Sequence, residues 1–472
     1  MKKISINWFR KDLRLNDNPS LNFLSKKNLP VLNLFIIDSD NQKPIGSASK
    51  VWLHYSLKDL NEQLENNLLI LQNDAQIVFE RILKYFDVKF ISWNRCYEPW
   101  RIKRDKNLKI FLKQKGISVK TFNGSLLWEP WNILKKDLTP YKVYSPFYKR
   151  GCLNFQSPRL PEKTSSFEIL NFKDTIQSDQ QFNLLPKVSW HKKTIKDWDM
   201  SKKGMEKKKS YFFNNSLSSY KDGRNFPSLK SVSELSPFIQ WGQISVNELW
   251  YKCQSHLNDE KIKDNAEHFM SELGWREFSY YLLYHFPSIN TQNFQKKFDN
   301  FPWIENKEFL KRWQMGITGY PIVDAGMREL RLTGYMHNRV RMIVGSFLVK
   351  NLLIDWRKGE EWFWDNLFDA DLANNSAGWQ WVAGSGADAA PYFRIFNPVS
   401  QGQKFDKDGT YTKRFVPELL KLDPKFLFCP WEASNDVLKK ANILLGVDYP
   451  RPIVDIKVSR EKALKSFSSI KI

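Results

Sequence analysis

The apolar run Val31-Leu32-Asn33-Leu34-Phe35-Ile36-Ile37 decides the fold of the first part of the chain, because it predicts a strand between two helical patterns. Four further short apolar runs repeat this alternation. Strands that alternate with helices are typical of right-handed crossovers in a parallel sheet. The expected strands are Ile4–Phe9, Val31–Ile37, Leu68–Leu71, Val88–Trp93 and Ile117–Phe122, and the expected helices are Pro19–Lys27, Ser49–Asn66, Ala75–Phe86 and Glu98–Lys115.

The sequence pattern divides the chain into two domains and a linker. Residues 1–127 should form an α/β domain with a five-stranded, Rossmann-like parallel sheet; no Gly-x-Gly-x-x-Gly follows its first strand, so ordinary dinucleotide binding is not expected there. Residues 128–210 lose periodicity and predict an interdomain linker that wraps the surface. Residues 211–472 should form an all-α domain, with candidate helices at Val246–Leu257, Ile262–His285, Val323–Thr333, Met336–Leu353 and Glu360–Leu367.

The composition favours a globular, polyanion-binding protein. The 472 residues are 42% apolar, and 73 Lys+Arg against 51 Asp+Glu give a formal charge of +22, which attracts nucleic acid. Lysine runs such as Lys202-Lys203 are equally compatible with ordinary solvated surface. No apolar run approaches the roughly 18 to 20 residues that span a bilayer, and Arg10 and Lys11 interrupt any signal peptide, so we expect a cytoplasmic protein.

The cysteines predict neither a metal site nor a disulfide. Cys96, Cys152, Cys253 and Cys429 lie far apart and form no Cys-x-x-Cys pair. Free buried thiols are the favoured interpretation, and no metal ion is expected.

The run Asp369-Ala370-Asp371-Leu372-Ala373-Asn374-Asn375-Ser376-Ala377-Gly378-Trp379-Gln380-Trp381 combines carboxylates, carboxamides and two tryptophans. It is too polar for a plain core helix and too aromatic for a solvated loop. Such a mixture suits the wall of a buried site for a planar ligand with polar edges.

Two of the expected helices each carry polar and large polarizable side chains on one face. Residues at i, i+3 and i+4 of a helix share a face. For a single helix, a surface salt bridge would explain the pattern as well, but two such faces together with the 369–381 run favour a shared site. The faces are Glu272, Trp275 and Arg276 in one helix, and Asn338, Arg341 and Met342 in the other.

The chain contains the segments Trp8–Asn18 (WFRKDLRLNDN), Glu272–Phe278 (ELGWREF), Gly319–Ala325 (GYPIVDA), Met336–Met342 (MHNRVRM) and Ala389–Pro398 (AAPYFRIFNP). These segments resemble the cryptochrome/photolyase family, most closely the class I cyclobutane pyrimidine dimer photolyases. The resemblance extends from Trp8 to about Pro430, and its second-half motifs are the most specific.

The resemblance implies a carbon-carbon lyase that repairs ultraviolet-damaged DNA. FAD in the helical domain would donate an electron, under blue light, to a pyrimidine dimer flipped out of the duplex, and the cyclobutane ring would split. The cofactor carries this chemistry, while the protein orients it and tunes its electronics. The implied partner is DNA that contains pyrimidine dimers, and the protein is expected to act as a monomer without membrane contact.

The resemblance also implies which residues hold FAD. Asn375 matches the asparagine that faces flavin N5, and Arg341 with Asp369 matches the pair beside the isoalloxazine ring. Val232 departs from the family, because many relatives have a phosphate-binding threonine there, and Phe269 stands where a tryptophan is common. The implied FAD-binding set is Tyr220, Ser233, Leu235, Ser236, Phe269, Arg276, Asn338, Arg341, Asp369, Asp371 and Asn375.

Substrate and electron-transfer residues are implied in the same way. Glu272, Asn338 and Met342 match residues that contact the dimer, and Trp275 and Trp381 match those that stack on the flipped bases. Histidines expected near Asn338 and Met342 in a (6-4) photolyase are absent. The implied phosphate contacts are Arg339, Arg394, Lys404 and Arg414, and the implied electron-transfer chain is Trp303, Trp356 and Trp379.

Two questions stay open on sequence grounds. The first domain should host a second, antenna chromophore of the folate or deazaflavin type. The segment Asn94–Pro99 resembles an antenna motif, but Lys50 and Cys96 replace an arginine and an aspartate of deazaflavin binders, so a folate, a deazaflavin, a flavin or an empty site all remain. The alternatives in function are a cryptochrome-type FAD receptor without repair and a basic nucleic-acid-binding protein without cofactor.

Overall fold

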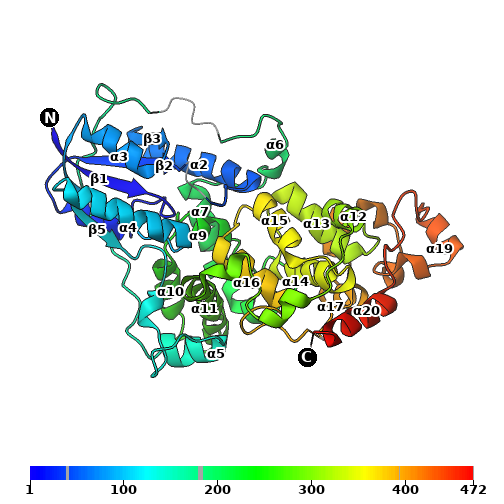
Figure 1. The fold of residues 1–472 in the computed structure, drawn as a ribbon. Coiled ribbons are helices and arrows are strands. Elements are labelled where there is room, and N and C mark those ends of the chain that lie inside the picture. The colour runs from blue at the N-terminus through cyan, green and yellow to red at the C-terminus, as the bar shows by residue number, and fades with distance from the viewer. Residues whose placement is uncertain (39–41, 179–183, 393, 471–472) are drawn as a thin grey trace. The chain divides into compact units, whose positions relative to one another are not determined.

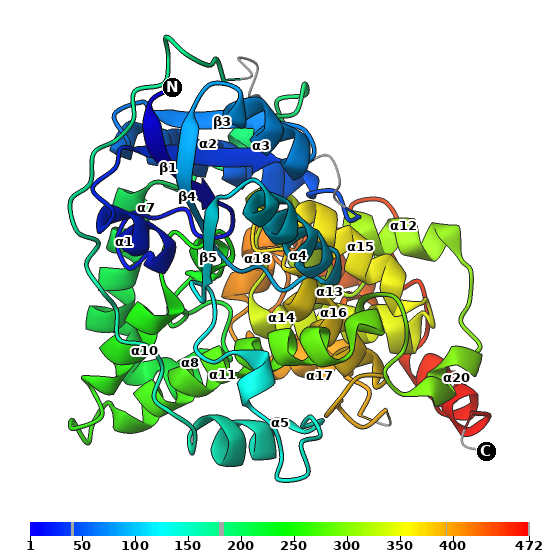
Figure 2. The same ribbon diagram turned by 60° about the vertical axis from the view of Figure 1, so that its left-hand side comes forward.

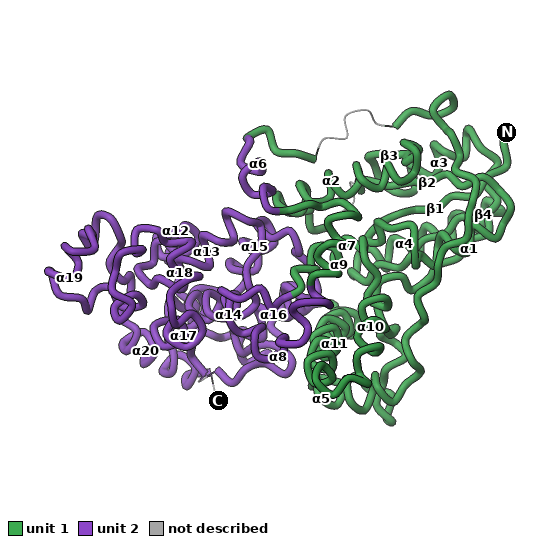
Figure 3. Tube along the Cα trace, turned by 180° about the vertical axis from the view of Figure 1, so that it is seen from behind, with its two compact units in different colours: residues 1–188, 198–211, 233–287 green, residues 189–197, 212–232, 288–472 purple. Residues whose placement is uncertain are grey.

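The structure, a computed structural model, describes residues 1–38, 42–178, 184–392 and 394–470. These residues form two compact units (Figure 3). Unit 1 comprises residues 1–188, 198–211 and 233–287, and unit 2 comprises residues 189–197, 212–232 and 288–472. The expected functional domains 1–127, 128–210 and 211–472 divide the chain by role and stay a prediction. Part of the expected linker and Phe393 of the motif at 389–398 lie outside the described residues.

Unit 1 begins with a parallel sheet of five strands. The strands are β1 (Lys3–Phe9), β2 (Val31–Ile37), β3 (Leu68–Gln72), β4 (Asp87–Asn94) and β5 (Ser118–Phe122). Every neighbouring pair is parallel, and the order across the sheet is β3-β2-β1-β4-β5. Strands β1 and β2 are drawn in blue in Figure 1. The predicted five-stranded α/β domain is therefore confirmed, with each predicted strand within a few residues of the observed one.

Four helices follow the strands, namely α1 (Pro19–Ser25), α2 (Ser47–Gln63), α3 (Ala75–Leu83) and α4 (Pro99–Gln114). Helices α3 and α4 bury their apolar residues in one cluster with Ile4, Ile6 and Trp8 of β1. On the opposite face, Phe23 of α1 contacts the ring of Phe122 at 5.5 Å. Helices thus cover both faces of the sheet (Figure 2), as parallel sheets require.

The sequence order of the strands reverses between β1 and β4. In open α/β sheets such a reversal creates a crevice at the carboxyl ends of the strands, where ligands bind. Here Arg10, directly after β1, forms an ion pair with Asp105 and donates a hydrogen bond to the carbonyl of Asn94 at the end of β4. Its guanidinium lies 4.8 Å from the centre of the Trp8 ring.

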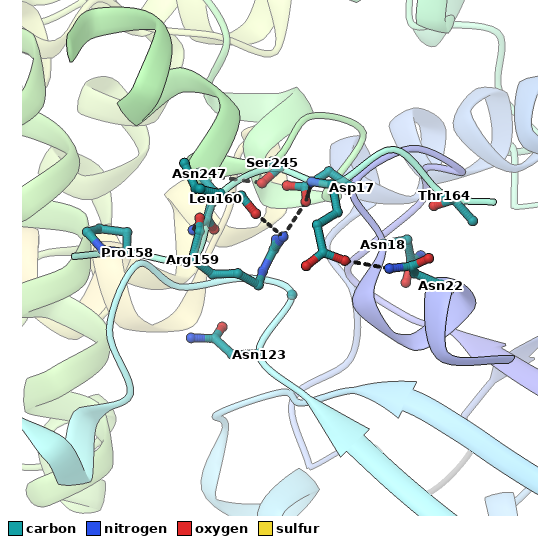
Figure 4. Close-up of polar contacts among 12 residues, drawn as sticks. Asp17, Asn18, Asn22, Asn123, Pro158, Arg159, Leu160, Thr164, Ser245 and Asn247 are labelled. Atoms are coloured by element: carbon teal, nitrogen blue, oxygen red, sulfur yellow. Dashed lines mark hydrogen bonds and ion pairs between the residues drawn. The ribbon is translucent and has the colours of Figure 1, made fainter. Parts of the chain in front are cut away.

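The segment 158–164 is fastened to the sheet domain by polar contacts (Figure 4). Arg159 forms an ion pair with Asp17, whose carboxylate also accepts a hydrogen bond from the Glu162 backbone at 2.9 Å. Glu162 accepts a hydrogen bond from Asn22 of α1, and Asn247 donates to the Arg159 carbonyl at 2.7 Å. This part of the predicted linker therefore packs on unit 1 through specific pairs.

Other parts of the predicted linker are helical. They include α5 (Tyr144–Pro146), the π-helical turn η2 (Phe147–Cys152) and α7 (Lys202–Tyr211). The aromatic residues Tyr144, Phe147 and Tyr148 are buried. Aromatic packing against α11 (Lys263–His285) stabilises α5 and η2, which are too short to form on propensity alone and therefore give no periodic signal.

Unit 2 is helical, and its helices approach closely where glycines allow it. The central ones are α13 (Pro321–Thr333), α14 (Asn338–Ser346), α15 (Trp356–Asn366) and α16 (Leu372–Ala383). A Cβ on Gly326 of α13 would lie 2.3 Å from Val340 of α14, and one on Gly359 of α15 would lie 2.1 Å from Trp379 of α16. Together with unit 1, this confirms the predicted fold class.

The boundaries of the predicted helices differ from the observed ones for local reasons. The helix expected at 336–353 is α14 followed by the π-helical turn η7 (Phe347–Asn351). The helix expected at 360–367 begins earlier, at Trp356, because the Asp355 side chain accepts the backbone N–H of Arg357 and caps it. Helices α10 (Val246–Gln254) and α11 agree with the prediction to within three residues.

Among the described residues, no helix combines the length and apolar character needed to cross a membrane. All four cysteines are buried and free, as predicted.

Candidate functional site

The run 369–381 is mostly helical, although its polar composition did not predict a helix. Asp371 caps the N-terminus of α16, where its carboxylate accepts the backbone N–H of Asn374 at 2.9 Å. The Asn374 side chain donates to the same oxygen at 2.7 Å. Gly384 ends the helix in the left-handed conformation, with φ of 85°. The acids of the run therefore precede the helix, and the tryptophans lie in its last turns.

Arg341 and Asp369 form an ion pair within unit 2. The Nη2 atom of Arg341 donates to Asp369 Oδ2 at 2.8 Å and to Oδ1 at 3.1 Å, and Nε donates to the Met336 carbonyl at 2.8 Å. Burial lowers the pKa of Arg341, but the Asp369 carboxylate outweighs burial and the net shift is upward. The Arg341 guanidinium thus stays charged at neutral pH and lies against the Asp369 carboxylate.

Asn375 is held by α15. Its Nδ2 atom donates to the backbone carbonyl of Glu360 at 2.9 Å and to the Glu360 carboxylate at 3.1 Å. Because the amide nitrogen is the donor in both bonds, the Oδ1 atom is the remaining hydrogen-bonding atom of this side chain, and it is an acceptor. Unit 2 thus offers a neutral acceptor at Asn375 in addition to the Arg341–Asp369 ion pair.

The three predicted electron-transfer tryptophans all lie in unit 2. Trp356 is fully buried at the start of α15, and its indole N–H donates to Asn293 at 2.9 Å. Trp379 is buried in α16 and contacts the rings of Phe363 at 5.0 Å and Trp313 at 6.1 Å. Trp303 is half-buried and contacts Phe301 at 4.4 Å. Trp356 and Trp379 are thus core residues, whereas Trp303 is partly buried against the same core.

The N-terminus of α14 contains a buried, neutral histidine among arginines. The Nδ1 atom of His337 accepts the backbone N–H of Arg339 at 3.2 Å, which places the ring proton on Nε2. Burial, followed by the charges of Arg224, Arg341 and Arg339, lowers the pKa of His337 to about 3. Its Nε2 atom is buried and has no hydrogen-bond partner among the described residues. An unused donor at a helix N-terminus with three arginines nearby suits an anion.

Arg339 itself is half-buried. It donates to Asn225 and lies over the ring of Phe405 at 4.5 Å. Burial and the neighbouring charge of Arg224 lower its pKa. The other residues of this helix differ in exposure, since Asn338 is exposed and Met342, 3.7 Å from Arg339 Nη1 through its sulfur, is half-buried.

The predicted face on α11 belongs to unit 1. Glu272 is half-exposed and lies 3.8 Å from His268, one turn earlier. Trp275 is stacked on Tyr144, with ring centroids 3.8 Å apart and an interplanar angle of 13°. Arg276 donates to Glu277 at 2.8 Å and lies over the ring of Tyr280. The structure therefore brings Glu272, Trp275 and Arg276 to one helix, as the spacing predicted.

The remaining predicted FAD residues are distributed over both units. Tyr220 is buried in unit 2, where its ring contacts Phe212 at 5.5 Å. In unit 1, Ser233 accepts the backbone N–H of Leu235 at 3.3 Å, and the buried Leu235 precedes the short helix α9 (Ser236–Gln240). Val232 is half-buried in unit 2, and Phe269 is buried on α11.

The remaining predicted DNA contacts are exposed basic side chains of unit 2. They are Arg394, Lys404 in α17 (Pro398–Phe405) and Arg414 in α18 (Thr410–Phe415). Trp381, predicted to stack on a base, is half-buried near the end of α16.

Sequence reasoning missed four contributors to these sites. Glu360 holds Asn375, His337 and Arg224 extend the basic cluster at α14, and Tyr144 covers Trp275. His337 and Arg224 are basic, like the residues predicted to contact phosphates. Only the three-dimensional structure, however, reveals that His337 Nε2 has no hydrogen-bond partner among the described residues. Within the described ranges, no group of three or more His, Cys, Asp or Glu side chains could hold a metal ion.

Comparison with known proteins gives a consistent family assignment. Residues 5–165 match the model of the DNA photolyase family, and residues 269–469 match that of the FAD binding domain of DNA photolyase. The chain is 44% identical, over 98% of its length and 97% of the relative, to the deoxyribodipyrimidine photo-lyase of Agrobacterium fabrum. It is 33% identical to cryptochrome-2 of Arabidopsis thaliana, over 99% of its length and 79% of the relative.

A solved structure corrects the expected subclass. The bacterial class III photolyase from Agrobacterium tumefaciens superimposes with a TM-score of 0.95 at 43% identity, and the alignment covers 100% of this chain and 98% of that one. The expected likeness to class I enzymes in particular is therefore not supported, whereas the family is. The chain belongs to the cryptochrome/photolyase family and has the two-part organisation of a DNA photolyase.

Proposed function

We propose that this chain is a deoxyribodipyrimidine photo-lyase, which binds FAD and uses blue light to split cyclobutane pyrimidine dimers in DNA. One observation carries the proposal, namely the 44% identity to a deoxyribodipyrimidine photo-lyase along nearly all of both chains. We further assign it to class III, because the class III structure is similar over the full length.

The partly buried polar groups of unit 2 suit the edge of a reduced flavin. Reduced FAD, when bound, supplies the photoexcited electron donor. Arg341 and Asp369 add no net charge to the site, so they tune it without opposing electron loss from an anionic ring. Asn375 Oδ1 can accept a hydrogen bond from a ring N–H, because its Nδ2 atom is engaged by Glu360. Tyr220, Ser233, Leu235, Ser236, Phe269, Arg276, Asn338 and Asp371 complete the proposed FAD set.

Glu272 and Trp275 are proposed to receive the lesion. Glu272 is half-exposed, and a carboxylate in this setting can accept hydrogen bonds from the edge of a flipped base. Trp275 and Trp381 offer aromatic faces for stacking, which replaces what the base loses when it leaves the duplex. Asn338 and Met342, on one face of α14, are proposed as the amide and the apolar contact of the dimer.

DNA phosphates are proposed to bind at the basic residues of unit 2. Arg339 and Arg224 lie close enough for their charges to repel, which an incoming phosphate would relieve. The unused Nε2–H of His337 can donate to an anion beside them. Arg394, Lys404 and Arg414 are exposed and would extend the contact along the strand by charge neutralisation.

Trp303, Trp356 and Trp379 are proposed to deliver electrons that reduce FAD under light. The burial of Trp356 and Trp379 supports the proposal, since aromatic rings in a dry core are protected from side reactions with water. Trp379 lies in the same helix as Asn375, one turn later, so it is the proposed member next to the flavin.

An antenna chromophore is proposed for unit 1, at the carboxyl ends of β1 and β4. Several buried polar atoms there lack partners among the described residues, including Trp8 Nε1, Trp100 Nε1 and Glu98 Oε2. Lys50 and Cys96 are the departures from deazaflavin binders. Cys96 accepts a weak hydrogen bond from Arg101 at 3.5 Å, so it does not offer an acidic group to a ligand. We propose a chromophore of the folate or deazaflavin type, which absorption beyond the flavin bands would test.

The similarity to cryptochromes makes a receptor function without repair the alternative. Substitution of Glu272 tests the proposed repair function against this alternative. Glu272→Gln keeps the shape and Glu272→Ala removes it. Repair per bound FAD should fall more in the alanine variant than in the glutamine variant, while FAD content stays near the wild-type value. Loss of FAD in step with repair would contradict the assigned role of Glu272. Absence of any light-dependent repair in the wild-type protein would instead favour the receptor.

A further inference from the structure

Tyr144 covers one face of the proposed lesion-binding tryptophan. Its ring centroid is 3.8 Å from that of Trp275, and the rings are nearly parallel, at 13°. Tyr144 belongs to α5, in the segment that the sequence predicted as linker, and Trp275 belongs to α11. The two elements lie side by side in unit 1 (Figures 1 and 3). A segment far away in sequence thus forms part of the wall around Trp275.

Tyr144 is attached to α11 at two points. Its hydroxyl donates to the Ser271 carbonyl at 2.6 Å, one helical turn before Trp275, and lies 2.9 Å from the Ser271 hydroxyl. The residue is 7% exposed, and burial raises the pKa of Tyr144 above the ordinary value, so the phenol remains a neutral donor. A hydrogen bond at one turn and a ring contact at the next fix both the position and the plane of the tyrosine.

A second tyrosine and a glycine support this arrangement. The ring of Tyr148 is nearly parallel to that of Tyr144, with centroids 5.5 Å apart and an angle of 12°. A Cβ on Gly274 would lie 2.6 Å from the Tyr148 ring and 2.7 Å from the Tyr144 hydroxyl. Since real Cβ contacts are essentially never below 3.0 Å, the tyrosines can sit this close to α11 only at a glycine.

The contacts restrict the orientation of the Trp275 ring and leave only part of it accessible. Tyr144 covers one indole face, and Phe278 approaches Trp275 edge-on, with ring centroids 6.0 Å apart at 73°. Trp275 nevertheless stays half-buried, so part of it remains accessible. A stacking surface that is already immobilised loses less conformational entropy when a base binds than a freely rotating one.

We propose that Tyr144 is a positioning residue for damage recognition, which holds Trp275 in the plane that receives the flipped pyrimidine dimer. The inference rests on the proposed stacking role of Trp275. Tyr144 does not touch the dimer in this account. It acts through Trp275, and the Tyr144 hydroxyl contributes by fixing the tyrosine on Ser271.

The test compares four variants of the FAD-loaded protein. Tyr144→Leu removes the ring, and Tyr144→Phe keeps the ring but removes the bond to Ser271. Gly274→Ala displaces the tyrosines without deleting them, and Trp275→Ala removes the stacking surface itself. Tyr141→Leu is the matched control, because Tyr141 is in the same segment but its ring contacts Phe147. Measurements are the Kd values for dimer-containing and undamaged duplexes, FAD content, and the rate of repair of the bound complex.

Tyr144→Leu should raise the Kd for dimer-containing DNA roughly three- to tenfold, the equivalent of one lost aromatic contact. The Kd for undamaged DNA, the FAD content and the repair rate of the bound complex should stay near wild type, and Tyr144→Phe should retain most of the affinity. Gly274→Ala should resemble Tyr144→Leu, while Tyr141→Leu should not. In protein labelled with 5-fluorotryptophan, the fluorine resonance that Trp275→Ala removes should shift or broaden in Tyr144→Leu.

Two results would overturn the inference in different ways. If Trp275→Ala weakens lesion binding while Tyr144→Leu and Gly274→Ala bind like wild type, Trp275 stacks on the lesion without help from Tyr144. If Trp275→Ala itself leaves lesion binding unchanged, the proposed function of Trp275 fails, and the role of Tyr144 fails with it.

Discussion

The Arg341 guanidinium contacts both carboxylate oxygens of Asp369 through the single atom Nη2, at 2.8 and 3.1 Å. Its Nε atom is fixed by the Met336 carbonyl, so the pair joins the start of α14 to the turn before α16. The Asp369 side chain is 6% exposed and that of Arg341 is 25% exposed. The proposed flavin wall is therefore stabilised by a charge pair that joins helix α14 to the turn before α16.

Asp369→Asn should destabilise the protein more than removal of a surface pair. The variant leaves the largely buried Arg341 without a counter-charge, and we expect the free energy of unfolding to fall by about 2 to 3 kcal/mol, less than for a fully buried pair. Asp355→Asn is the control, because its pair with Arg357 is 28% and 37% exposed and its capping oxygen is retained. That change should cost less than about 1 kcal/mol. If urea titrations gave equal losses of unfolding free energy for the two variants, the larger contribution of the Arg341–Asp369 pair would be contradicted.

His337 should make stability sensitive to acid. Its pKa is lowered to about 3 in the fold, below the 6.5 of an ordinary histidine. The unfolded chain therefore binds a proton first, so the stabilisation is complete above pH 6.5 and is lost as the pH falls towards 3. Between pH 6.5 and 5 the free energy of unfolding should drop by about 2 kcal/mol from this group. His337→Asn keeps a helix-capping side chain and should remove that part of the slope; an unchanged slope would contradict the assignment.

Glu329 should act in the opposite direction. Burial raises its pKa to about 7, despite hydrogen bonds from the Tyr411 hydroxyl at 2.6 Å and the His337 backbone. A raised acid pKa means that the folded state keeps the proton longer, so the stabilisation is present below pH 4.5 and is lost as the pH rises through 7. The loss should be about 3 kcal/mol. Glu329→Gln keeps both acceptor contacts and should be more stable than wild type at pH 8 but not at pH 4.5. The reverse order would refute the neutral carboxyl.

Arg339→Ala should weaken DNA binding uniformly and lower its salt dependence. If Arg339 neutralises one phosphate, the slope of log K against log salt should become less negative by about 0.9. Part of the loss would come from packing, because Arg339 lies over Phe405. Arg331→Ala, an exposed arginine at the end of α13, serves as the control and should leave the slope unchanged. A slope for Arg339→Ala equal to that of wild type would exclude the phosphate contact.

The α/β part of the fold could be predicted because its signals are local. Val31–Ile37 is apolar except for Asn33, as expected of a strand buried on both faces, and the helical patterns between the strands indicate the crossovers. The 369–381 run was harder, because capping by Asp371 and the bonds of Asn375 to Glu360 allow polar residues at the start of a helix. The sequence therefore predicted a site there but not its secondary structure.

Contacts between distant segments could not be predicted. Tyr144 and Trp275 stack although nothing in the sequence near Tyr144 pairs it with α11. The unpartnered Nε2 of His337 depends on a tautomer that the Arg339 backbone imposes. Both features arise from tertiary packing, which single-sequence periodicity does not contain.

The central claim is light-driven repair, and one measurement tests it most directly. Purified protein with reduced FAD is mixed with a duplex that carries one cyclobutane thymine dimer, and intact thymines are counted after blue light and after an equal time in darkness. The account predicts restoration of the thymines under light and none in darkness, with more than one dimer repaired per protein. Equal results in light and darkness, or no restoration by FAD-loaded protein, would contradict it.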